Sequence, residues 1–282
     1  MFPAPFTYSR ASSVQDALAK LQENPDAKIL AGGHSLIPAM KLRLAMPGAL
    51  IDLRDIPELR GIEVGDDTVT IRAMVTYNEI RDNAEVSAVL PILGEAIGVI
   101  GDQQVREHGT LAGALAHNDP AADLTAVVLA LGGSVHAVGP NGERDISLDE
   151  FFVDLWTTAL EPEEIITHVT LNRHDGASMA YRKFAHPASG YAVVGVASVV
   201  DLEGGNVASA RVAVTGASNT ATRLTAIEEA LADKALDEAT VADAVANATD
   251  GISINGDEFA SESYRAHLVQ VLARRALLGT QV

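Results

Sequence analysis

The sequence predicts an α+β protein, with an N-terminal α/β domain of two subdomains and a C-terminal domain of a three-stranded antiparallel sheet plus helices. Of the 282 residues 48% are hydrophobic but only 4% aromatic, so the core is built mainly from Ala, Val, Leu and Ile. Helical and strand patterns alternate in the first part of the chain. In the last part, three strand patterns precede three helical ones.

The opening segment predicts the order helix, strand, glycine turn, helix, strand. Ser12 and Ser13 precede apolar positions with helical spacing, which predicts a capped helix that ends before Pro25. The other elements expected here are a buried strand over residues 28–31, a helix over 35–44 and a strand over 49–53.

The next segment begins with a hairpin. Strands over residues 61–64 and 69–73 flank a turn of Gly65, Asp66 and Asp67. Thr76 and Glu79 have the spacing of a capping box, so a mainly helical stretch begins there and runs, interrupted at Pro91, to about Ile100. The segment continues with a helix over 121–131 and strands over 135–138 and 165–171.

The pattern changes around His174-Asp175-Gly176, which we take as the domain boundary. The expected domains are residues 1–175, with subdomains of about 1–55 and 56–175, and residues 176–282. The second domain should contain strands over 179–184, 191–201 and 208–215, and helices over 224–232, 240–248 and 263–278.

Charge and cysteine content exclude several classes of function. The formal net charge of −18 opposes binding to nucleic acid, because such binding requires neutralisation of phosphates. With no cysteine, the chain cannot itself ligate an iron–sulfur cluster, form a disulfide or use a thiol nucleophile. No signal sequence and no apolar stretch approaching about 18 residues is present, so we expect a soluble cytoplasmic protein.

Other chemistry-bearing residues show no catalytic pattern. The histidines lack metal-ligand spacing, so no metal is assigned, and neither a Ser-His-Asp constellation nor a hydrolytic carboxylate pair can be argued. Trp156 follows Phe151 and Phe152 in an apolar cluster, which predicts that it packs in the core.

The strongest local signal is the glycine-containing segment Ala31-Gly32-Gly33-His34-Ser35, between a strand and a helix. Adjacent glycines let a ligand approach the main chain, and several N–H groups could converge on an anion such as a pyrophosphate. A tight strand-to-helix turn without a ligand is the open alternative. The segment matches neither the G-x-G-x-x-G fingerprint nor a P-loop.

A second small-residue stretch, residues 109–123, again stands ahead of a helix. Two such loops suit a long dinucleotide held mainly by main-chain donors, which would let an acidic protein bind an anion. His117 in this stretch could lie near a redox ring and exchange protons, or could be a structural histidine that caps a turn.

These segments resemble a known family. Residues 31–38 leading into 40–45, Ile51-Asp52-Leu53-Arg54, Gly109-Thr110, and Asp119-Pro120-Ala121-Ala122-Asp123 are similar to the FAD-binding medium subunit of molybdenum hydroxylases. Within that family the likeness is nearest to the medium subunit of aerobic carbon monoxide dehydrogenase, and it covers essentially the whole chain. It implies a PCMH-type FAD-binding domain, with the C-terminal domain closing over the flavin.

The resemblance also implies site residues. The FAD pyrophosphate would be wrapped by the first loop, in which His34 acts through its main-chain N–H, while Asp123 would accept hydrogen bonds from FAD hydroxyls. Flavin-ring neighbours would be Ile166, Lys183, Tyr191 and, unless it is a structural histidine that caps a turn, His117. The residues of the two loops are Ala31, Gly32, Gly33, His34 and Ser35, then Thr110, Leu111, Ala112, Gly113 and Ala114.

The sequence departs from the family pattern at four positions. Ala112 stands where the family has Gly, and Ala114 stands where it has a polar residue. Because Ala resists positive φ, the second loop could bind less closely, or the subunit could be a scaffold that has lost FAD. His186 and Gly190 stand where relatives often carry Arg and Asp.

The resemblance implies a complex. A large molybdenum-cofactor subunit would oxidise the substrate, a small subunit with [2Fe-2S] clusters would relay electrons, and FAD here would pass them to an external acceptor such as quinone. The expected assembly is a cytoplasmic dimer of heterotrimers that could associate with the inner face of the membrane. The alternative substrates are aldehydes, purines and other N-heterocycles.

Overall fold

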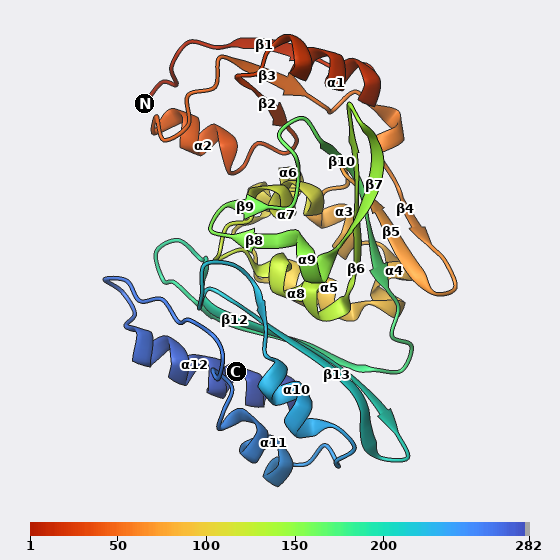
Figure 1. The fold of residues 1–282 in the computed structure, drawn as a ribbon, viewed down its shortest axis with the longest axis vertical. Coiled ribbons are helices and arrows are strands. Elements are labelled where there is room, and N and C mark those ends of the chain that lie inside the picture. Colours follow the sequence, from red (N-terminus) through yellow and green to blue (C-terminus); the bar gives the residue numbers. More distant parts are fainter. Residues whose placement is uncertain (280–282) are drawn as a thin grey trace.

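The computed structural model describes residues 1–279 and has three parts stacked along its long axis (Figure 1). A small N-terminal sheet with two helices lies at one end, a five-stranded sheet with most of the helices is in the middle, and a four-stranded sheet with the last helices is at the other end. Mixed helix and sheet content, as the sequence predicts, is therefore confirmed. In the described chain no helix is both long and apolar enough to span a membrane.

The N-terminal sheet is parallel, in the order β1-β3-β2. Helix α1 begins where the sequence predicts, because the Ser13 hydroxyl accepts a hydrogen bond from the Asp16 N–H at 3.0 Å. Helix α2 is shorter than expected, and Arg43 adopts a φ of +60° just beyond it. The bounds are β1 (Thr7–Arg10), α1 (Val14–Glu23), β2 (Ala27–Leu30), α2 (Leu36–Lys41) and β3 (Ala49–Asp52).

The central sheet has the order β4-β5-β10-β6-β7, and all its pairings are antiparallel. The capping box predicted at Thr76 and Glu79 is present at the start of α3, and Pro91 occupies the first turn of α5. The strands are β4 (Ile62–Val64), β5 (Thr68–Arg72), β6 (Gly133–Gly139), β7 (Gly142–Ser147) and β10 (Ile165–Asn172).

Short helices surround this sheet. Their bounds, with those of a separate hairpin, are η1 (Pro57–Leu59), α3 (Tyr77–Arg81), α4 (Ala84–Val89), α5 (Pro91–Gly98), α6 (Gln103–His108), α7 (Leu111–His117), α8 (Asp123–Leu131), α9 (Leu148–Phe151), β8 (Phe152–Asp154) and β9 (Thr157–Thr158).

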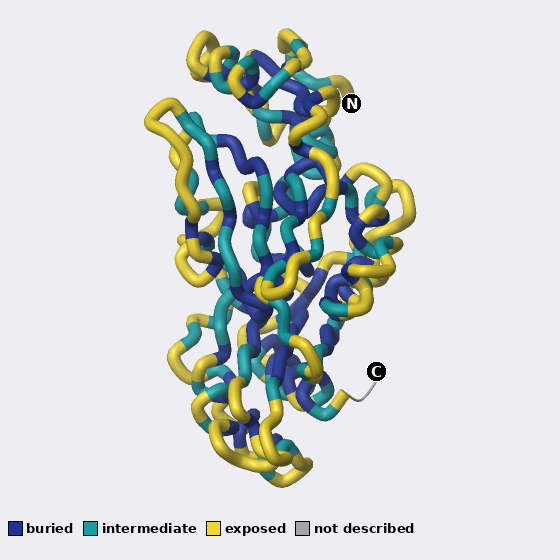
Figure 2. The backbone as a smooth tube through the Cα atoms, turned by 90° about the vertical axis from the view of Figure 1, so that its right-hand side faces the viewer, coloured by how far each residue is buried: buried dark blue, intermediate teal, exposed yellow. Residues whose placement is uncertain are grey.

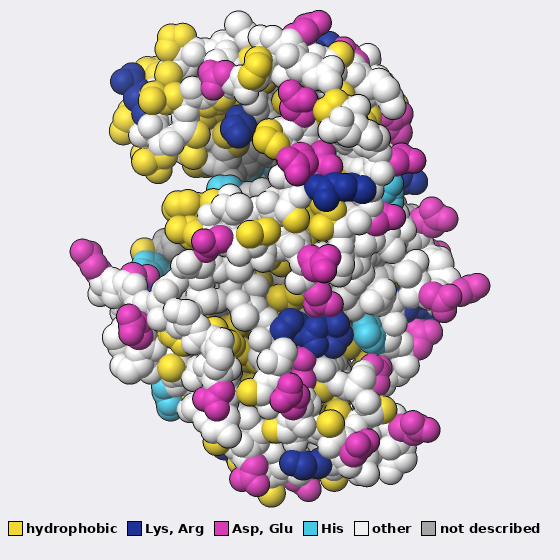
Figure 3. Space-filling model, in the orientation of Figure 1, with side chains coloured by type: hydrophobic (Ala, Val, Ile, Leu, Met, Phe, Trp, Pro, Cys, Tyr) yellow, Lys and Arg dark blue, Asp and Glu magenta, His cyan; other side chains and the backbone are white. Residues whose placement is uncertain are grey.

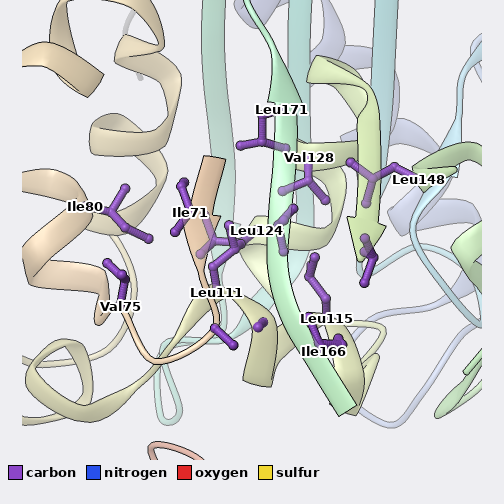
Figure 4. Packing of buried hydrophobic residues seen from close by; sticks show 14 of the residues in the cluster. Ile71, Val75, Ile80, Leu111, Leu115, Leu124, Val128, Leu148, Ile166 and Leu171 are labelled. Carbon is purple, nitrogen blue, oxygen red and sulfur yellow. The ribbon is translucent and has the colours of Figure 1, made fainter. Parts of the chain in front are cut away.

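Helix α8 is the centre of the core, and every one of its residues is buried. Figure 4 shows Leu124 and Val128 of α8, with Leu111 and Leu115 of α7, among side chains from the central strands. Figure 2 shows the buried backbone running through the middle of the molecule, while exposed residues gather in loops. The N-terminal ends of α7 and α8 are therefore packed into this core.

The C-terminal sheet is antiparallel, in the order β11-β12-β13-β14. The three predicted strands are present, with β14 as a short addition. Buried side chains of α10, α11 and α12 share a hydrophobic cluster with this sheet. The bounds are β11 (Ser178–Ala185), β12 (Ala192–Glu203), β13 (Asn206–Thr215), β14 (Thr222–Arg223), α10 (Thr225–Leu231), α11 (Glu238–Val245) and α12 (Glu262–Leu277).

The predicted core position of Trp156 is wrong. This residue lies in the tight turn between β8 and β9, with φ of +49° and 62% of its surface exposed. The apolar cluster around it is real, but only Phe151 is fully buried there. The two-residue turn directs the neighbouring chain outward, which local hydrophobicity did not indicate.

Candidate functional site

The first glycine loop is shaped by two different constraints. Gly33 has φ of +75°, a conformation that side chains other than glycine rarely adopt. Gly32 is needed for space, because a Cβ built on it would lie 1.8 Å from the His108 carbonyl oxygen. The loop that connects β2 to α2 therefore lies directly on the C-terminal end of α6.

The second small-residue stretch is the start of a helix rather than a loop. Thr110 caps α7, and its hydroxyl accepts a hydrogen bond from the Gly113 N–H at 3.1 Å. Residues 111–114 lie in the helix, so Ala112 and Ala114 need no positive φ. The conformational objection to alanine at these two positions does not apply.

The two stretches meet in space. A Cβ built on Gly113 would lie 3.7 Å from the Ala31 Cβ, and the rings of His34 and His108 stack with centroids 5.3 Å apart. A cavity of about 390 Å³ adjoins this contact; Ala31, Gly32, His108 and Thr110 line it together with Arg54, Arg60, Met74, Thr76, Glu79 and Glu107.

Main-chain donors are left unpaired in the first loop. Within residues 1–279, no group accepts a hydrogen bond from the main-chain N–H of Gly32, Gly33, His34 or Ser35. The N–H of Ala112, in the first turn of α7, likewise has no acceptor within that range. A set of free amides beside a glycine that tolerates close approach suits an anion, and the anion needs no basic side chain.

A buried polar cluster lies at the start of α8. Asp123 is 5% exposed; one of its oxygens accepts a hydrogen bond from the Tyr181 hydroxyl at 2.7 Å, and the carboxylate lies 2.9 and 3.0 Å from the Lys183 ammonium. Burial raises the pKa of Asp123, while the charge of Lys183 and hydrogen bonds from Lys183 and Tyr181 act in the opposite direction.

Lys183 is held as firmly as its partner. Its side chain is 4% exposed, and besides Asp123 it donates to the Val99 carbonyl at 3.1 Å. These three contacts match the three donors of an ammonium group. Asp123, with about four lone-pair positions, keeps capacity for a further donor.

Tyr191 lies near the same cluster, at the end of a compact loop. The His186 N–H donates to the Tyr191 carbonyl, and the His186 ring nitrogen Nδ1 accepts hydrogen bonds from the Ala188 and Ser189 N–H groups. Tyr191 is 44% exposed, and its pKa is raised by partial burial and then by the charges of Asp119 and Asp123. Its ring is therefore available at the surface beside these carboxylates.

Two other residues predicted to lie near the flavin ring, Ile166 and His117, are not part of the cluster around Asp123. The Ile166 side chain is buried in the core beside Leu115, next to a β-bulge of β10 (Figure 4). The His117 side chain is partly exposed at the C-terminal end of α7, with Nε2 3.9 Å from Asp119 Oδ2. No group of three potential metal ligands occurs in the part of the chain that the structure describes.

Sequence reasoning missed Tyr77 and Asn118. The Tyr77 ring packs against Gly109, and burial, with the charges of Asp123 and Tyr191, raises the pKa of its phenol. Asn118 is fully buried in the left-handed region that caps α7, a position that asparagine tolerates. An asparagine directly after a helical pattern is a signal for a helix C-cap, and it could have identified Asn118. No comparable signal in the sequence pointed to Tyr77.

Known proteins match this chain along its length. Residues 4–172 match the family described as the FAD binding domain in molybdopterin dehydrogenase, and residues 179–280 match the CO dehydrogenase flavoprotein C-terminal domain. The carbon monoxide dehydrogenase medium chain of Hydrogenophaga pseudoflava is 37% identical, covering 98% of this chain and 97% of that protein.

Two further matches bear on function. The alpha subunit of the 6-hydroxypseudooxynicotine dehydrogenase complex of Paenarthrobacter nicotinovorans is 36% identical, covering 98% of this chain and 95% of that protein. A solved structure of carbon monoxide dehydrogenase from H. pseudoflava has a chain that superposes with a TM-score of 0.96 at 38% identity, covering 99% of this chain and 98% of that one.

Proposed function

The chain belongs to the family of FAD-binding medium subunits of molybdenum hydroxylases, and we propose that it is the electron-transfer subunit of a complex of the carbon monoxide dehydrogenase type. As an oxidoreductase flavoprotein subunit, it would take electrons from iron–sulfur clusters of a partner and pass them to an external acceptor. The observation that carries the proposal is the set of free main-chain amides where the two small-residue stretches meet.

The donor set fits the diphosphate of FAD. The amides of Gly32, Gly33, His34 and Ser35 would donate hydrogen bonds to this group, and the free N–H in the first turn of α7 would add to them. Because these donors belong to the main chain, they carry no charge of their own. A chain of net charge −18 can thereby hold an anionic cofactor.

The polar cluster at the start of α8 would bind the other end of FAD, which carries the ribityl chain and the flavin ring. Asp123 has the remaining acceptor capacity to orient a hydroxyl, and the Lys183 ammonium, which donates to Asp123 and to the Val99 carbonyl, favours the charged form of the buried carboxylate. Tyr191, exposed beside Asp119 and Asp123, would cover a face of the ring. Ile166 would act through packing, and His117 through its partly exposed imidazole at the site's edge.

FAD, when bound, supplies a centre that exchanges single electrons with iron–sulfur clusters and electron pairs with an organic acceptor. Since the chain has no cysteine, the clusters must belong to another subunit. We propose a small [2Fe-2S] subunit and a large molybdenum-cofactor subunit as partners, a quinone as acceptor and a dimer of heterotrimers as the assembly.

The domain boundary proposed from the sequence, at residues 175 and 176, is supported by the gap between the two family matches, at 172 and 179. With this boundary, β11 belongs to the C-terminal domain. That domain would then contribute Lys183 and Tyr191 to a site built mainly by the N-terminal domain.

An absorbance spectrum of the purified complex, followed by acid release of the chromophore, tests the proposal. We expect a flavin spectrum and about one FAD released for each copy of this chain. Absence of flavin from both measurements would contradict the proposal and favour a scaffold subunit.

A second candidate is a flavin subunit for a hydroxylase of aldehydes, purines or other N-heterocycles. It is favoured by the 36% identity to the 6-hydroxypseudooxynicotine dehydrogenase subunit, close to the 37% for the carbon monoxide dehydrogenase chain. Assays of the intact complex with carbon monoxide and with aldehydes separate the two candidates, because the substrate pocket lies on a partner.

A further inference from the structure

The turn between β8 and β9 holds a bulky aromatic residue in an unfavourable conformation. Trp156 has φ of +49°, a region that large side chains rarely occupy because Cβ crowds the main chain. Its ring is mostly exposed, so packing does not repay this strain. Glycine or asparagine would form the same turn at lower cost.

The surrounding structure imposes the turn. The buried Asn118 side-chain amide donates to the Asp154 carbonyl at 2.9 Å and to the Thr157 carbonyl at 2.8 Å, on either side of Trp156. From the C-terminal domain, Asn219 donates to the Asp154 carboxylate at 2.8 Å and Thr220 donates to the Asn118 side-chain oxygen at 2.8 Å. Strain that several elements hold in place is characteristic of functional positions.

The turn also gathers exposed apolar surface. Val153 is 57% exposed and Leu155 is 40% exposed, beside the 62% exposed Trp156. Figure 3 shows hydrophobic side chains over β8 and β9 at the edge of a hollow below α2. Tryptophan is the residue most enriched among the anchors of protein interfaces.

This surface is continuous with the proposed flavin site. Asn118 donates two hydrogen bonds to the turn, and three residues later the Ala121 carbonyl accepts a hydrogen bond at 3.4 Å from the N–H of Ala192, the residue next to Tyr191. The same helix, α7, begins with the Thr110 cap at the proposed diphosphate site. A partner seated on the turn would therefore stand beside the flavin.

We propose that Val153, Leu155 and Trp156 form the docking surface for the iron–sulfur subunit of the complex, with Trp156 as its anchor. The inference rests on the proposed function for the identity of the partner. The exposed Asp154, which lies in the turn between Val153 and Leu155, favours a partner surface with an apolar pocket bordered by Lys or Arg.

The test compares stability with association. The full FAD-loaded chain, as wild type, Trp156→Gly or Trp156→Phe, is titrated against the complex of its two partner subunits, and the melting temperature of each chain is measured alone. We expect Trp156→Gly to weaken association about tenfold or more while its melting temperature stays the same or rises. Trp156→Phe should retain most of the affinity.

Two control variants keep the comparison specific. Leu202→Ala removes an exposed apolar side chain at the end of β12, and Asp233→Gly relieves a positive φ of 61° in the C-terminal domain. Both should leave association unchanged. A photoactivatable phenylalanine at position 156 should cross-link to the iron–sulfur subunit.

The proposal is overturned if Trp156→Gly lowers the melting temperature and leaves association unchanged, since the ring would then serve the fold. A cross-link only to the large subunit, or an effect confined to the KM for quinone, would also overturn it. Flavin content is measured on the same samples. A wild-type chain without flavin would contradict the proposed function, whatever the docking result.

Discussion

The two stretches that meet at the proposed diphosphate site offer similar amides but obtain them differently. The first loop depends on glycine at two positions. Gly33 has positive φ, and at Gly32 the neighbouring His108 carbonyl leaves no space for a Cβ. The second stretch depends on a capped helix, in which Ala112 and Ala114 are ordinary residues. An anion site can therefore tolerate alanine for glycine on one side and not on the other.

The largest effect should come from Gly32→Ala. Its Cβ would overlap the His108 carbonyl, so the loop must move away from α6, and we expect a loss of about 3 kcal/mol in FAD binding. Acid-released flavin measures the loss. Gly94→Ala in α5 is the matched control, because a Cβ there meets nothing within 4 Å. Equal flavin content in both variants would contradict the steric account.

Asp123→Asn should have the next largest effect. It leaves the Lys183 ammonium buried without its carboxylate, and breaking such a pair costs about 3 kcal/mol in the free energy of unfolding. Urea denaturation measures this cost. In the double variant Asp123→Asn with Lys183→Met, much of the stability should return. If it does not, the ion pair is not the source of the loss.

Thr110→Ala tests the capped side. Loss of the bond from the Gly113 N–H should cost about 1.5 kcal/mol in the free energy of unfolding, with a smaller decrease in FAD affinity than for Gly32→Ala. Thermal unfolding and FAD titration provide the two values. Thr110→Ser keeps the hydroxyl, so its stability and FAD affinity should be close to those of the wild type. If Thr110→Ser is as destabilised as Thr110→Ala, the hydroxyl cap is not the source of the effect.

The smallest effect is expected for Ala112→Gly, which installs the glycine that the family resemblance leads us to expect at this position. Glycine inside a helix costs about 0.5–1 kcal/mol relative to alanine, so stability should fall slightly. FAD affinity, measured by fluorescence titration, should not improve. Tighter binding would mean that residue 112 behaves as a loop position, contrary to the helical start of α7.

Local signals predicted much of this fold. The caps at Ser13 and Thr76, the hairpin around residues 65–67 and the C-terminal strands follow from neighbouring residues, and the structure contains them. Strand β1 was missed because its pairing partner, β3, is about forty residues away, and short strands have little pattern of their own.

The site was harder to predict than the fold. The small residues of 110–114 suggested a nucleotide-binding loop, although alanine is the best helix former and Thr110 is a good cap. The cluster of Asp123, Tyr181 and Lys183 joins residues about sixty positions apart, so its hydrogen bonds could not be read from spacing. Trp156 was predicted to lie in the core because its neighbours are apolar. The positive φ that places it in an exposed turn cannot be inferred from hydrophobicity.

If main-chain amides hold the diphosphate of FAD, affinity must depend on that diphosphate, and a series of related ligands tests this dependence. The full chain, stripped of cofactor, is titrated with FAD, FMN and riboflavin, and ADP is tested as a competitor. We predict FAD affinity at least about 100-fold above that of riboflavin, FMN in between, and displacement of FAD by ADP. Riboflavin binding as tight as FAD binding, with no competition by ADP, would contradict the account.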